Sequence, residues 1–250
     1  YFKIELRKSN NIKEYIDYID SNTICLVASA PCYPYGIIDD IERVNDLAIC
    51  YNKNFHIDCC LGGFILPFLE GNKVNFNLEG LTSISLDLHK YAYTPKGSSL
   101  ILYRSNEFIH HQYYIQPKWC GGIYASPTTL GSKSGLLIAQ SWATILYYGK
   151  NKYTEYANRI VNATIKLKNE IYQIDKLFVY GDPKTCIVGV GSNDIDIYSL
   201  VIQMNRLGWH LTNLQNPPGF HICITMQNID QLDKFVEDLK KCIKDITTKV

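Results

Sequence analysis

Two lysines, a histidine and an aspartate follow strand-like runs of this sequence. Residues 85–97 (SLDLHKYAYTPKG) place His89 directly before Lys90 and carry a second lysine, Lys96. Asp58 ends another strand-like run, at residues 55–58. A solvated loop is the ordinary explanation of such residues, and their spacing alone favours it.

Lys90 and Asp58 together are the protein groups that pyridoxal phosphate chemistry requires. A lysine sheltered at a strand end can lose its proton readily enough to form a Schiff base with a carbonyl. An aspartate at another strand end can keep a pyridine nitrogen protonated, which makes that cofactor an electron sink. On this pair alone the assignment is weak, because solvated charges at helix or strand ends explain it better.

The first half of the chain alternates helix-like and strand-like patterns, which favours an α/β fold. The alternating runs are residues 11–20, 23–30, 39–47, 55–58, 81–86 and 98–104. Such alternation indicates parallel pairing in a sheet whose polar groups collect at the carboxyl ends of the strands. Asp58, His89 and Lys90 all occupy such ends.

A second region with its own elements follows residue 134. We expect its helices at residues 135–148, 152–174, 196–207 and from 229 onward, and its strands at 177–180, 186–190 and 221–226. These patterns predict a small α+β domain at residues 135–250, after a larger α/β region at residues 1–134. The sequence contains no internal repeat and no low-complexity tract.

The composition excludes several classes of protein. Of the 250 residues 46% are hydrophobic and 20% are charged, and the formal net charge is +1 with a pI of about 7.6. We therefore predict no nucleic-acid partner and no other polyanion partner. The nine cysteines have no regular spacing, which indicates reduced thiols in a cytosolic environment and not a disulfide framework.

The most apolar window is residues 136–148 (LLIAQSWATILYY), which is too short to span a bilayer and predicts a buried helix. No signal peptide is visible, and the first residue is Tyr1. This beginning indicates a chain that was processed or cut from a longer one.

Other kinds of site fit the sequence less well. His56, Cys59 and Cys60 next to Asp58 suggest metal ligands, but in a strand Cys59 points away from the face that His56 and Asp58 share. No second ligand pair at zinc-finger spacing occurs, so we predict no metal site. Phosphate-binding loops of the P-loop or dinucleotide type and motifs for a serine or cysteine nucleophile are also missing.

Five blocks of sequence resemble the sphingosine-1-phosphate lyases, which belong to the pyridoxal-phosphate-dependent group II decarboxylases of fold type I. The blocks are SAPCYPYGIID (29–39), HIDCCLGGF (56–64), TSISLDLHKYAYTPKGSSLILY (82–103), GGIYASPTTLGSKSG (121–135), and the tail segments SNDIDIYSL (192–200) and GWHLTNLQNPPGFHICIT (208–225). They keep the family's order and span nearly the whole chain. The resemblance implies part of the cofactor-binding large domain, a mainly parallel sheet with helices, at residues 1–134, and the small C-terminal domain at 135–250.

The resemblance also implies roles for individual residues near the first sheet. Lys90 would be the Schiff-base lysine, Asp58 would bind the pyridine nitrogen, and His89 would contact the cofactor phosphate. Lys96 would face the active site, where its ammonium meets the phosphate of the substrate. For His89 the alternative is a loop histidine that contacts only protein.

Tyr124 and Ser132 lie in the fourth block and take their roles from the same resemblance. Tyr124 would stand near the reacting carbons as a proton-transfer group or hydrogen-bond donor, although a packing role stays open. Ser132 would reach the cofactor phosphate of a neighbouring subunit, which implies a homodimer with a shared active site. The family usually has Arg-Pro where Lys133 and Ser134 stand, and this departure loosens the loop that carries Ser132.

The resemblance implies a pyridoxal-phosphate-dependent carbon–carbon lyase. Its substrate would be a phosphorylated sphingoid base, sphingosine 1-phosphate, cleaved by retro-aldol chemistry to a fatty aldehyde and phosphoethanolamine. One alternative is an amino-acid decarboxylase of the same fold, which needs Lys90 and Asp58 but has no use for Lys96. The other is a non-catalytic, truncated homologue that serves as a dimerisation partner.

The resemblance further implies that part of the cofactor site lies upstream of this sequence. Family members carry there a loop that binds the cofactor phosphate and a histidine that stacks on the pyridine ring. A membrane segment also precedes the catalytic domain, so we expect a cytosolic-facing parent protein at the endoplasmic reticulum, anchored by a segment absent from this chain. The isolated chain should bind pyridoxal phosphate poorly, aggregate or need a partner, and show no lyase activity.

Overall fold

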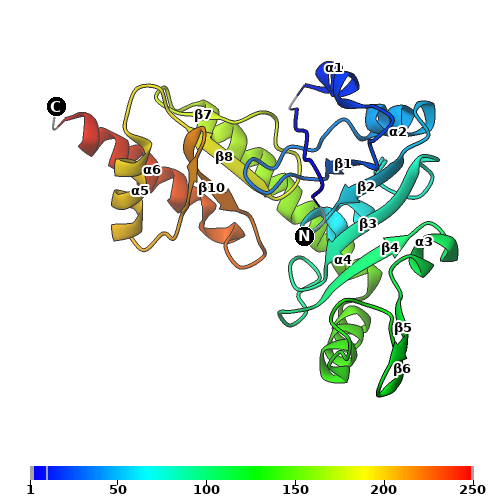
Figure 1. Cartoon of the computed structure of the whole chain (residues 1–250). Coiled ribbons are helices and arrows are strands. Elements are labelled where there is room, and N and C mark those ends of the chain that lie inside the picture. The colour runs from blue at the N-terminus through cyan, green and yellow to red at the C-terminus, as the bar shows by residue number, and fades with distance from the viewer. Residues whose placement is uncertain (1–2, 10, 249–250) are drawn as a thin grey trace. The chain divides into compact units, whose positions relative to one another are not determined.

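A computed structural model of the chain describes residues 3–9 and 11–248. The α-helices are α1 (Ile12–Tyr15), α2 (Ile41–Cys50), α3 (Asn106–His110), α4 (Gly135–Tyr172), α5 (Ile197–Arg206) and α6 (Leu232–Thr247) (Figure 1). The strands are β1 (Cys25–Ser29), β2 (Asn54–Asp58), β3 (Leu81–Asp87), β4 (Ser99–Tyr103), β5 (Tyr114–Trp119), β6 (Gly122–Ser126), β7 (Phe178–Val179), β8 (Ile187–Gly191), β9 (Thr212–Gln215) and β10 (Pro218–Cys223). The mixture confirms the predicted α/β class.

The chain forms two compact units, each assembled from separate stretches of sequence. Unit 1 consists of residues up to 28, residues 40–60 and residues 73–147, and unit 2 consists of residues 29–39, residues 61–72 and residues from 148 onward. Contacts and not sequence order define these units. The expected domain division after residue 134 therefore stays a prediction.

The sheet of unit 1 has the strand order β1-β2-β3-β4. Strands β2 and β3 run parallel, whereas β4 runs antiparallel to β3. Residues 88–98, which connect β3 to β4, contain no helix, so they cannot make the crossover that a parallel pair needs. The sheet is therefore mixed, with β4 as its antiparallel strand at one edge, and this agrees with the predicted fold class.

Helix α2 and strand β2 show why one face of this sheet is apolar. Asp40 caps α2 by accepting a hydrogen bond from the Arg43 amide, and the buried residues of the helix are mostly apolar. Burial alternates along β2, with Phe55 and Ile57 fully buried. Because successive strand side chains point to opposite faces, His56 and Asp58 share the other face.

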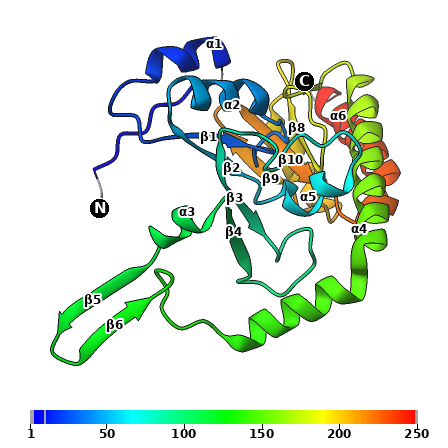
Figure 2. The same ribbon diagram turned by 90° about the vertical axis from the view of Figure 1, so that its right-hand side faces the viewer.

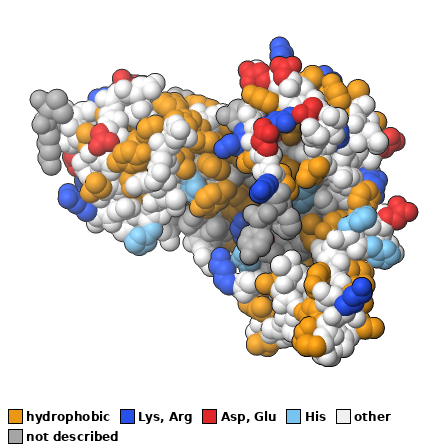
Figure 3. Space-filling model, viewed as in Figure 1, with side chains coloured by type: hydrophobic (Ala, Val, Ile, Leu, Met, Phe, Trp, Pro, Cys, Tyr) orange, Lys and Arg blue, Asp and Glu red, His pale blue; other side chains and the backbone are white. Residues whose placement is uncertain are grey.

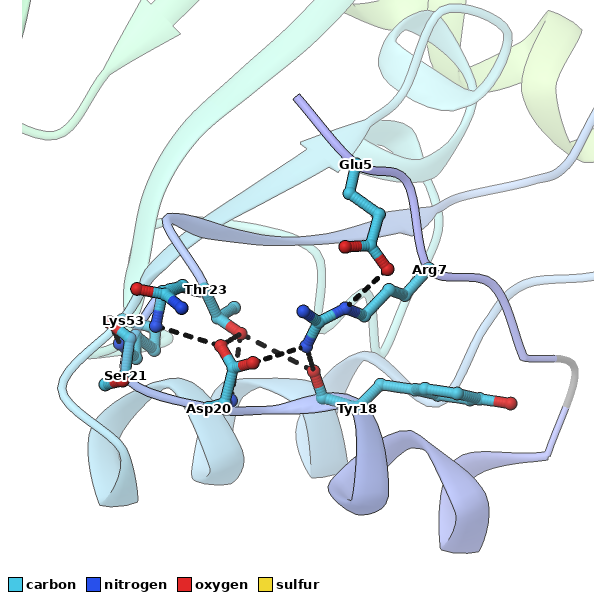
Figure 4. Close-up of polar contacts among 8 residues, drawn as sticks. Glu5, Arg7, Tyr18, Asp20, Ser21, Thr23 and Lys53 are labelled. Atoms are coloured by element: carbon cyan, nitrogen blue, oxygen red, sulfur yellow. Dashed lines mark hydrogen bonds and ion pairs between the residues drawn. The ribbon is translucent and has the colours of Figure 1, made fainter. Parts of the chain in front are cut away.

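The segment before β1 is tied to unit 1 by polar contacts (Figure 4). The Arg7 guanidinium donates to Asp20 Oδ2 at 2.8 Å and to the Tyr18 carbonyl at 2.9 Å, and its Nε donates to Glu5 at 3.1 Å. The hydrogen bond from Arg7 holds the pKa of Asp20 below its usual value. Lys53 donates to the Ser21 carbonyl at 3.2 Å and so links this segment to the end of α2.

The sheet of unit 2 has the order β7-β8-β10-β9, and all of its strand pairs are antiparallel. Every residue of β8 is buried, and helices α5 and α6 turn apolar faces inward. This is the small α+β module that the second half of the sequence predicts. Its core is nearly free of charge.

Helix α4 is interrupted at Gly149, whose φ of 62° and ψ of 173° are not helical. Such backbone angles are almost confined to glycine, which has no Cβ. Figure 2 shows the bend in the ribbon. The boundary between the two compact units falls beside it, after Tyr147.

The first half of α4 corrects the prediction that residues 136–148 form a buried helix. The residues are helical, but Leu136, Ile138, Trp142, Leu146 and Tyr147 are all exposed. Exposed hydrophobic side chains also cover the hairpin β5–β6, as the lower part of Figure 3 shows. Among the described residues, no helix combines the length and the apolar character needed to cross a bilayer.

Candidate active site

Strands β2 and β3 bring the predicted cofactor residues to one face of the first sheet. In their parallel register Asp58 lies opposite Ser85 and His56 lies opposite Ser83. Asp87 follows two residues after Ser85 and therefore projects from the same face of β3. The structure thus collects two carboxylates, a histidine and two hydroxyls near the carboxyl ends of two neighbouring strands.

Lys90 lies in the turn that leaves β3, directly beside Asp87. Its amide donates to the Asp87 carbonyl at 3.3 Å, and its Nζ lies 2.9 Å from Asp87 Oδ2. Burial lowers the pKa of Lys90, but the hydrogen bond and charge of Asp87 and the contact with Cys60 outweigh burial, so the pKa is raised. Contrary to the expectation of easy proton loss, this lysine is held as an ammonium ion.

Cys60 connects Lys90 to Asp58. Its amide donates to Asp58 Oδ1 at 2.9 Å, and its side chain interacts with both Lys90 and Asp58. Burial raises the pKa of the Cys60 thiol although Lys90 acts in the opposite direction. The contacts of Cys60 show that Lys90 and Asp58, distant in sequence, lie in one site.

Asp87 is a site residue that the sequence analysis missed. Ser99 and Lys90 both donate to its carboxylate, and they lower its pKa although burial alone would raise it. The available signal was its position three residues before Lys90, a spacing that lets side chains meet within one turn of chain. The same spacing is common in solvated loops, so the signal had little weight.

His89 uses its two ring nitrogens differently. Nδ1 donates to the Ser98 carbonyl at 2.8 Å, while Nε2 lies 3.8 Å from Asp87 Oδ2. Because the first contact fixes the ring, Nε2 is the nitrogen that can meet a phosphate. This geometry suits the predicted role of His89 and leaves it a prediction.

Lys96 is exposed at a turn that side-chain hydrogen bonds hold in place. Thr94 and Ser98 join hydroxyls at 2.6 Å, and Ser98 also donates to the Pro95 carbonyl at 2.7 Å. Gly97 has a φ of 94°, which favours glycine there. The turn fixes the backbone of Lys96 and leaves its side chain in solvent.

Tyr124 and Ser132 come from the hairpin β5–β6 and the loop that follows it. Tyr124 stands on β6 with its ring near those of Tyr114 and Trp119, and it is 44% exposed. Figure 2 shows the hairpin extending away from the first sheet. Ser132 is exposed in the loop that follows the hairpin. The structure therefore joins three of the six predicted residues, Asp58, Lys90 and His89, through contacts with Cys60 and Asp87. The roles of Lys96, Tyr124 and Ser132 stay predictions.

Gly62, in the glycine pair that follows Asp58, lies in a tightly packed part of unit 2. A Cβ on Gly62 would lie 2.0 Å from the Ala30 carbonyl oxygen and 2.9 Å from Leu66. No side chain fits in that space, so the backbone of Gly62 can approach Ala30 closely only because the residue is glycine.

The side chains near the ends of β2 and β3 fit pyridoxal phosphate. Asp58 supplies an acceptor for a protonated pyridine nitrogen, and Lys90 supplies a primary amine within the same half-buried site. His89 Nε2 adds a group for the phosphate. Both His56 nitrogens contact serine hydroxyls, and the described residues form no cluster that could hold a metal ion.

Comparison with known proteins places these observations in a family. The pyridoxal-dependent decarboxylase conserved domain matches residues 5–190. The chain is 41% identical to a sphingosine-1-phosphate lyase of Arabidopsis thaliana over 98% of its length, which is 47% of the plant protein. It is 40% identical to a sphingosine-1-phosphate lyase of Drosophila melanogaster, with 98% of this chain and 48% of that protein covered. The chain thus spans about half the length of these relatives.

Solved structures show the same likeness. A sphingosine-1-phosphate lyase of Burkholderia pseudomallei superposes with a TM-score of 0.89 at 35% identity, covering 94% of this chain and 55% of that one. A glutamate decarboxylase of Lactobacillus brevis gives a TM-score of 0.82 at 19% identity, with 94% of this chain and 58% of that one covered. The second match shows a shared fold alone.

Proposed function

The chain belongs to the pyridoxal-dependent decarboxylase family, and from this premise we propose that it supplies the catalytic lysine and the pyridine-binding aspartate of a carbon–carbon lyase. The substrate proposed is a long-chain base 1-phosphate such as sphingosine 1-phosphate, cleaved to a fatty aldehyde and phosphoethanolamine. The observation that carries the proposal is the joining of Lys90 and Asp58 through Cys60. The similarity to sphingosine-1-phosphate lyases supports the choice of substrate.

Pyridoxal phosphate, when bound, supplies the electron sink for breaking the carbon–carbon bond. Asp58 would accept a hydrogen bond from the pyridine nitrogen and keep that nitrogen protonated. His89 Nε2 would bind the phosphate, since Nδ1 is already engaged by the Ser98 carbonyl. Together these two residues would hold opposite ends of the cofactor.

Lys90 must lose a proton before its Nζ can attack a carbonyl. Asp87 Oδ2, 2.9 Å away, stabilises the ammonium form and so raises the pH at which that proton leaves. The same carboxylate therefore stabilises the free site and sets the pH at which Lys90 becomes reactive.

Lys96 distinguishes the lyase from its nearest alternative. An exposed ammonium on a fixed turn suits a substrate that carries a phosphate, and an amino-acid decarboxylase has no such group to bind. The decarboxylase relative at 19% identity supports the fold and not that activity.

A homodimer completes the proposal. Tyr124 and Ser132 lie on or beside the exposed hairpin, and the first half of α4 exposes large apolar side chains. Exposed apolar surface of this kind marks interaction sites. We assign both residues to the active site of the partner copy.

We also place the protein at the cytosolic face of the endoplasmic reticulum. Imaging of the tagged protein against a reticulum marker tests this location.

Borohydride trapping tests the lysine assignment directly. Reduction in the presence of pyridoxal phosphate fixes the cofactor covalently to the lysine that holds it, and peptide mapping locates the label. We expect the label on Lys90 and not on Lys96. Labelling spread over exposed lysines would refute the assignment.

The reaction is tested on a chimera, in which the chain is joined to the part of the Burkholderia pseudomallei lyase that has no counterpart in it. Release of fatty aldehyde from sphingosine 1-phosphate supports the lyase. Release of carbon dioxide from glutamate or aromatic amino acids would support the decarboxylase instead. A chimera that binds pyridoxal phosphate and does neither would support the non-catalytic alternative.

A further inference from the structure

A row of hydrogen bonds runs behind Asp58 on the face shared by β2 and β3. His56 Nδ1 lies 2.8 Å from Ser83 Oγ, and His56 Nε2 lies 3.1 Å from Ser85 Oγ. Ser85 Oγ in turn donates to Asp58 Oδ1 at 3.4 Å. The row depends on the strand register, because Ser83 is opposite His56 and Ser85 is opposite Asp58.

The charge of Asp58 sets the direction of every bond in this row. An ionised carboxylate only accepts hydrogen bonds, so the Ser85 hydroxyl must donate its one hydrogen to Asp58. Ser85 Oγ can then only accept from His56, which places the ring proton on Nε2. A neutral imidazole has one ring proton, and therefore Nδ1 accepts from Ser83. Burial lowers the pKa of His56 although the charge of Asp58 acts against it, which favours this neutral ring.

The same contacts fix the orientation of the Asp58 carboxylate. Ser85 Oγ and the Cys60 amide both donate to Oδ1. Two donors at one oxygen resist rotation of the group, and Oδ2 keeps its acceptor capacity for a further donor.

We propose that His56 and Ser85 are positioning residues for the cofactor, holding the Asp58 carboxylate aimed at the pyridine nitrogen of pyridoxal phosphate. The inference rests on the proposed binding of that cofactor by this chain. His56 does not touch the cofactor and acts through Ser85 and Asp58. Ser83, at the far end of the row, donates its hydroxyl proton to His56 Nδ1 in that tautomer.

The ring tautomer can be measured without cofactor. Long-range nitrogen–proton NMR correlations distinguish the two protonated nitrogens of a histidine. We expect His56 to be protonated at Nε2 in the chain as it stands. A proton on Nδ1 would reverse the row and overturn the proposal.

The second test compares pyridoxal phosphate with its 1-deaza analogue, which has carbon in place of the pyridine nitrogen. His56→Leu and Ser85→Ala remove links of the row, whereas His56→Gln keeps an amide donor near the Nε2 position. His111→Leu is the matched control, because His111 is exposed. Each variant is made in the chimera described above, and absorbance titration gives its dissociation constant for both ligands.

The expected result is selective. His56→Leu and Ser85→Ala should weaken binding of pyridoxal phosphate about tenfold or more, because hydrogen bonds to charged groups are at stake. They should leave binding of the analogue within about twofold, and His56→Gln should restore most of the lost affinity.

Two outcomes would overturn the inference, and they differ. Equal losses for both ligands would show that His56 merely supports the fold, while cofactor binding itself stands. Failure of the chimera with the unsubstituted chain to bind either ligand would refute the proposed function, and the inference with it. The His111→Leu control should match the unsubstituted chimera with both ligands.

Discussion

The two four-stranded sheets differ in what their central strands carry. In unit 2, β8 is buried along its whole length, and its neighbour β10 is mostly buried. In unit 1, β2 and β3 bury apolar residues on one face and line the other with His56, Asp58 and serines. A sheet needs only one apolar face to be held in place, so the other face of the first sheet is free for chemistry.

A half-buried histidine in the first sheet and a buried histidine in the second make the contrast concrete. His56 contacts serine hydroxyls with both ring nitrogens. His221 donates from Nδ1 to the Pro34 carbonyl at 3.1 Å, and its Nε2 is buried with no hydrogen-bond partner among the described residues. The first histidine connects to a carboxylate, whereas the second holds a loop against a strand.

Lys90→Ala should give the largest effect on activity, and it concerns only the sheet of unit 1, which carries the candidate active site. We expect lyase activity of the chimera to fall below about 0.1% of its parent, which is ~4 kcal/mol or more of barrier. Circular dichroism should show an unchanged fold, because Lys90 lies in a turn. Lys96→Ala is the control, since it should weaken substrate binding and still allow trapping of cofactor at Lys90. Residual activity of a few per cent in Lys90→Ala would contradict the assignment.

Phe220→Ala tests how much the buried core of the unit 2 sheet contributes to stability. Phe220 is fully buried in β10, and such truncations cost about 3–4 kcal/mol of unfolding free energy. Denaturant unfolding measures the loss. Ile202→Ala, on the exposed face of α5, provides a control that should change stability by less than about 1 kcal/mol. Similar losses in both variants would mean that β10 is not the core of its unit.

Asp87→Asn should shift the reactivity of Lys90 with pH. Removing the carboxylate charge lowers the pKa of Lys90, because Asp87 supplies the hydrogen bond and charge that hold it above its usual value. Borohydride trapping at Lys90 should therefore reach half its maximum at a lower pH than in the parent. Ser99→Ala, which removes only a donor to Asp87, should shift the profile less. An unchanged profile in Asp87→Asn would exclude Asp87 as the controlling group.

Acidification should have the smallest effect, a loss of folding stability through protonation of His56 and His221. Burial lowers the pKa values of His56 and His221 in the folded chain, so the unfolded chain binds protons first. Their contribution to stability is complete above about pH 6.5 and declines as the pH falls through that value toward the folded pKa. His221→Asn keeps a donor for Pro34 without titrating, and should flatten this decline. The exposed His210 should give no such change when replaced by Asn.

The parts of the site that could be predicted were those with unusual residue types at strand ends. Lys90 and Asp58 qualified, and the structure brings them together through Cys60. Asp87 and Ser85 could not be singled out, because an aspartate and a serine within a strand have no function until their neighbours are known. For residues 136–148 the sequence analysis predicted a feature, burial, that the structure does not have. Their apolar character was read correctly as helical, but burial depends on what packs against a helix, and that lies outside any local pattern.

By itself the sequence determined the α/β class, the runs that become β2 and β3, and the placement of Asp58 and Lys90 at or just beyond their ends. Only the tertiary structure decided the register between those strands, the antiparallel return of β4 and the pairing of Lys90 with Asp87. The physical reason is the two-residue period of a strand. Shifting β3 by one residue against β2 would turn Ser83, Ser85 and Asp87 to the opposite face and separate them from His56 and Asp58. Local residue types cannot settle that choice, because it depends on which faces of both strands are buried at once.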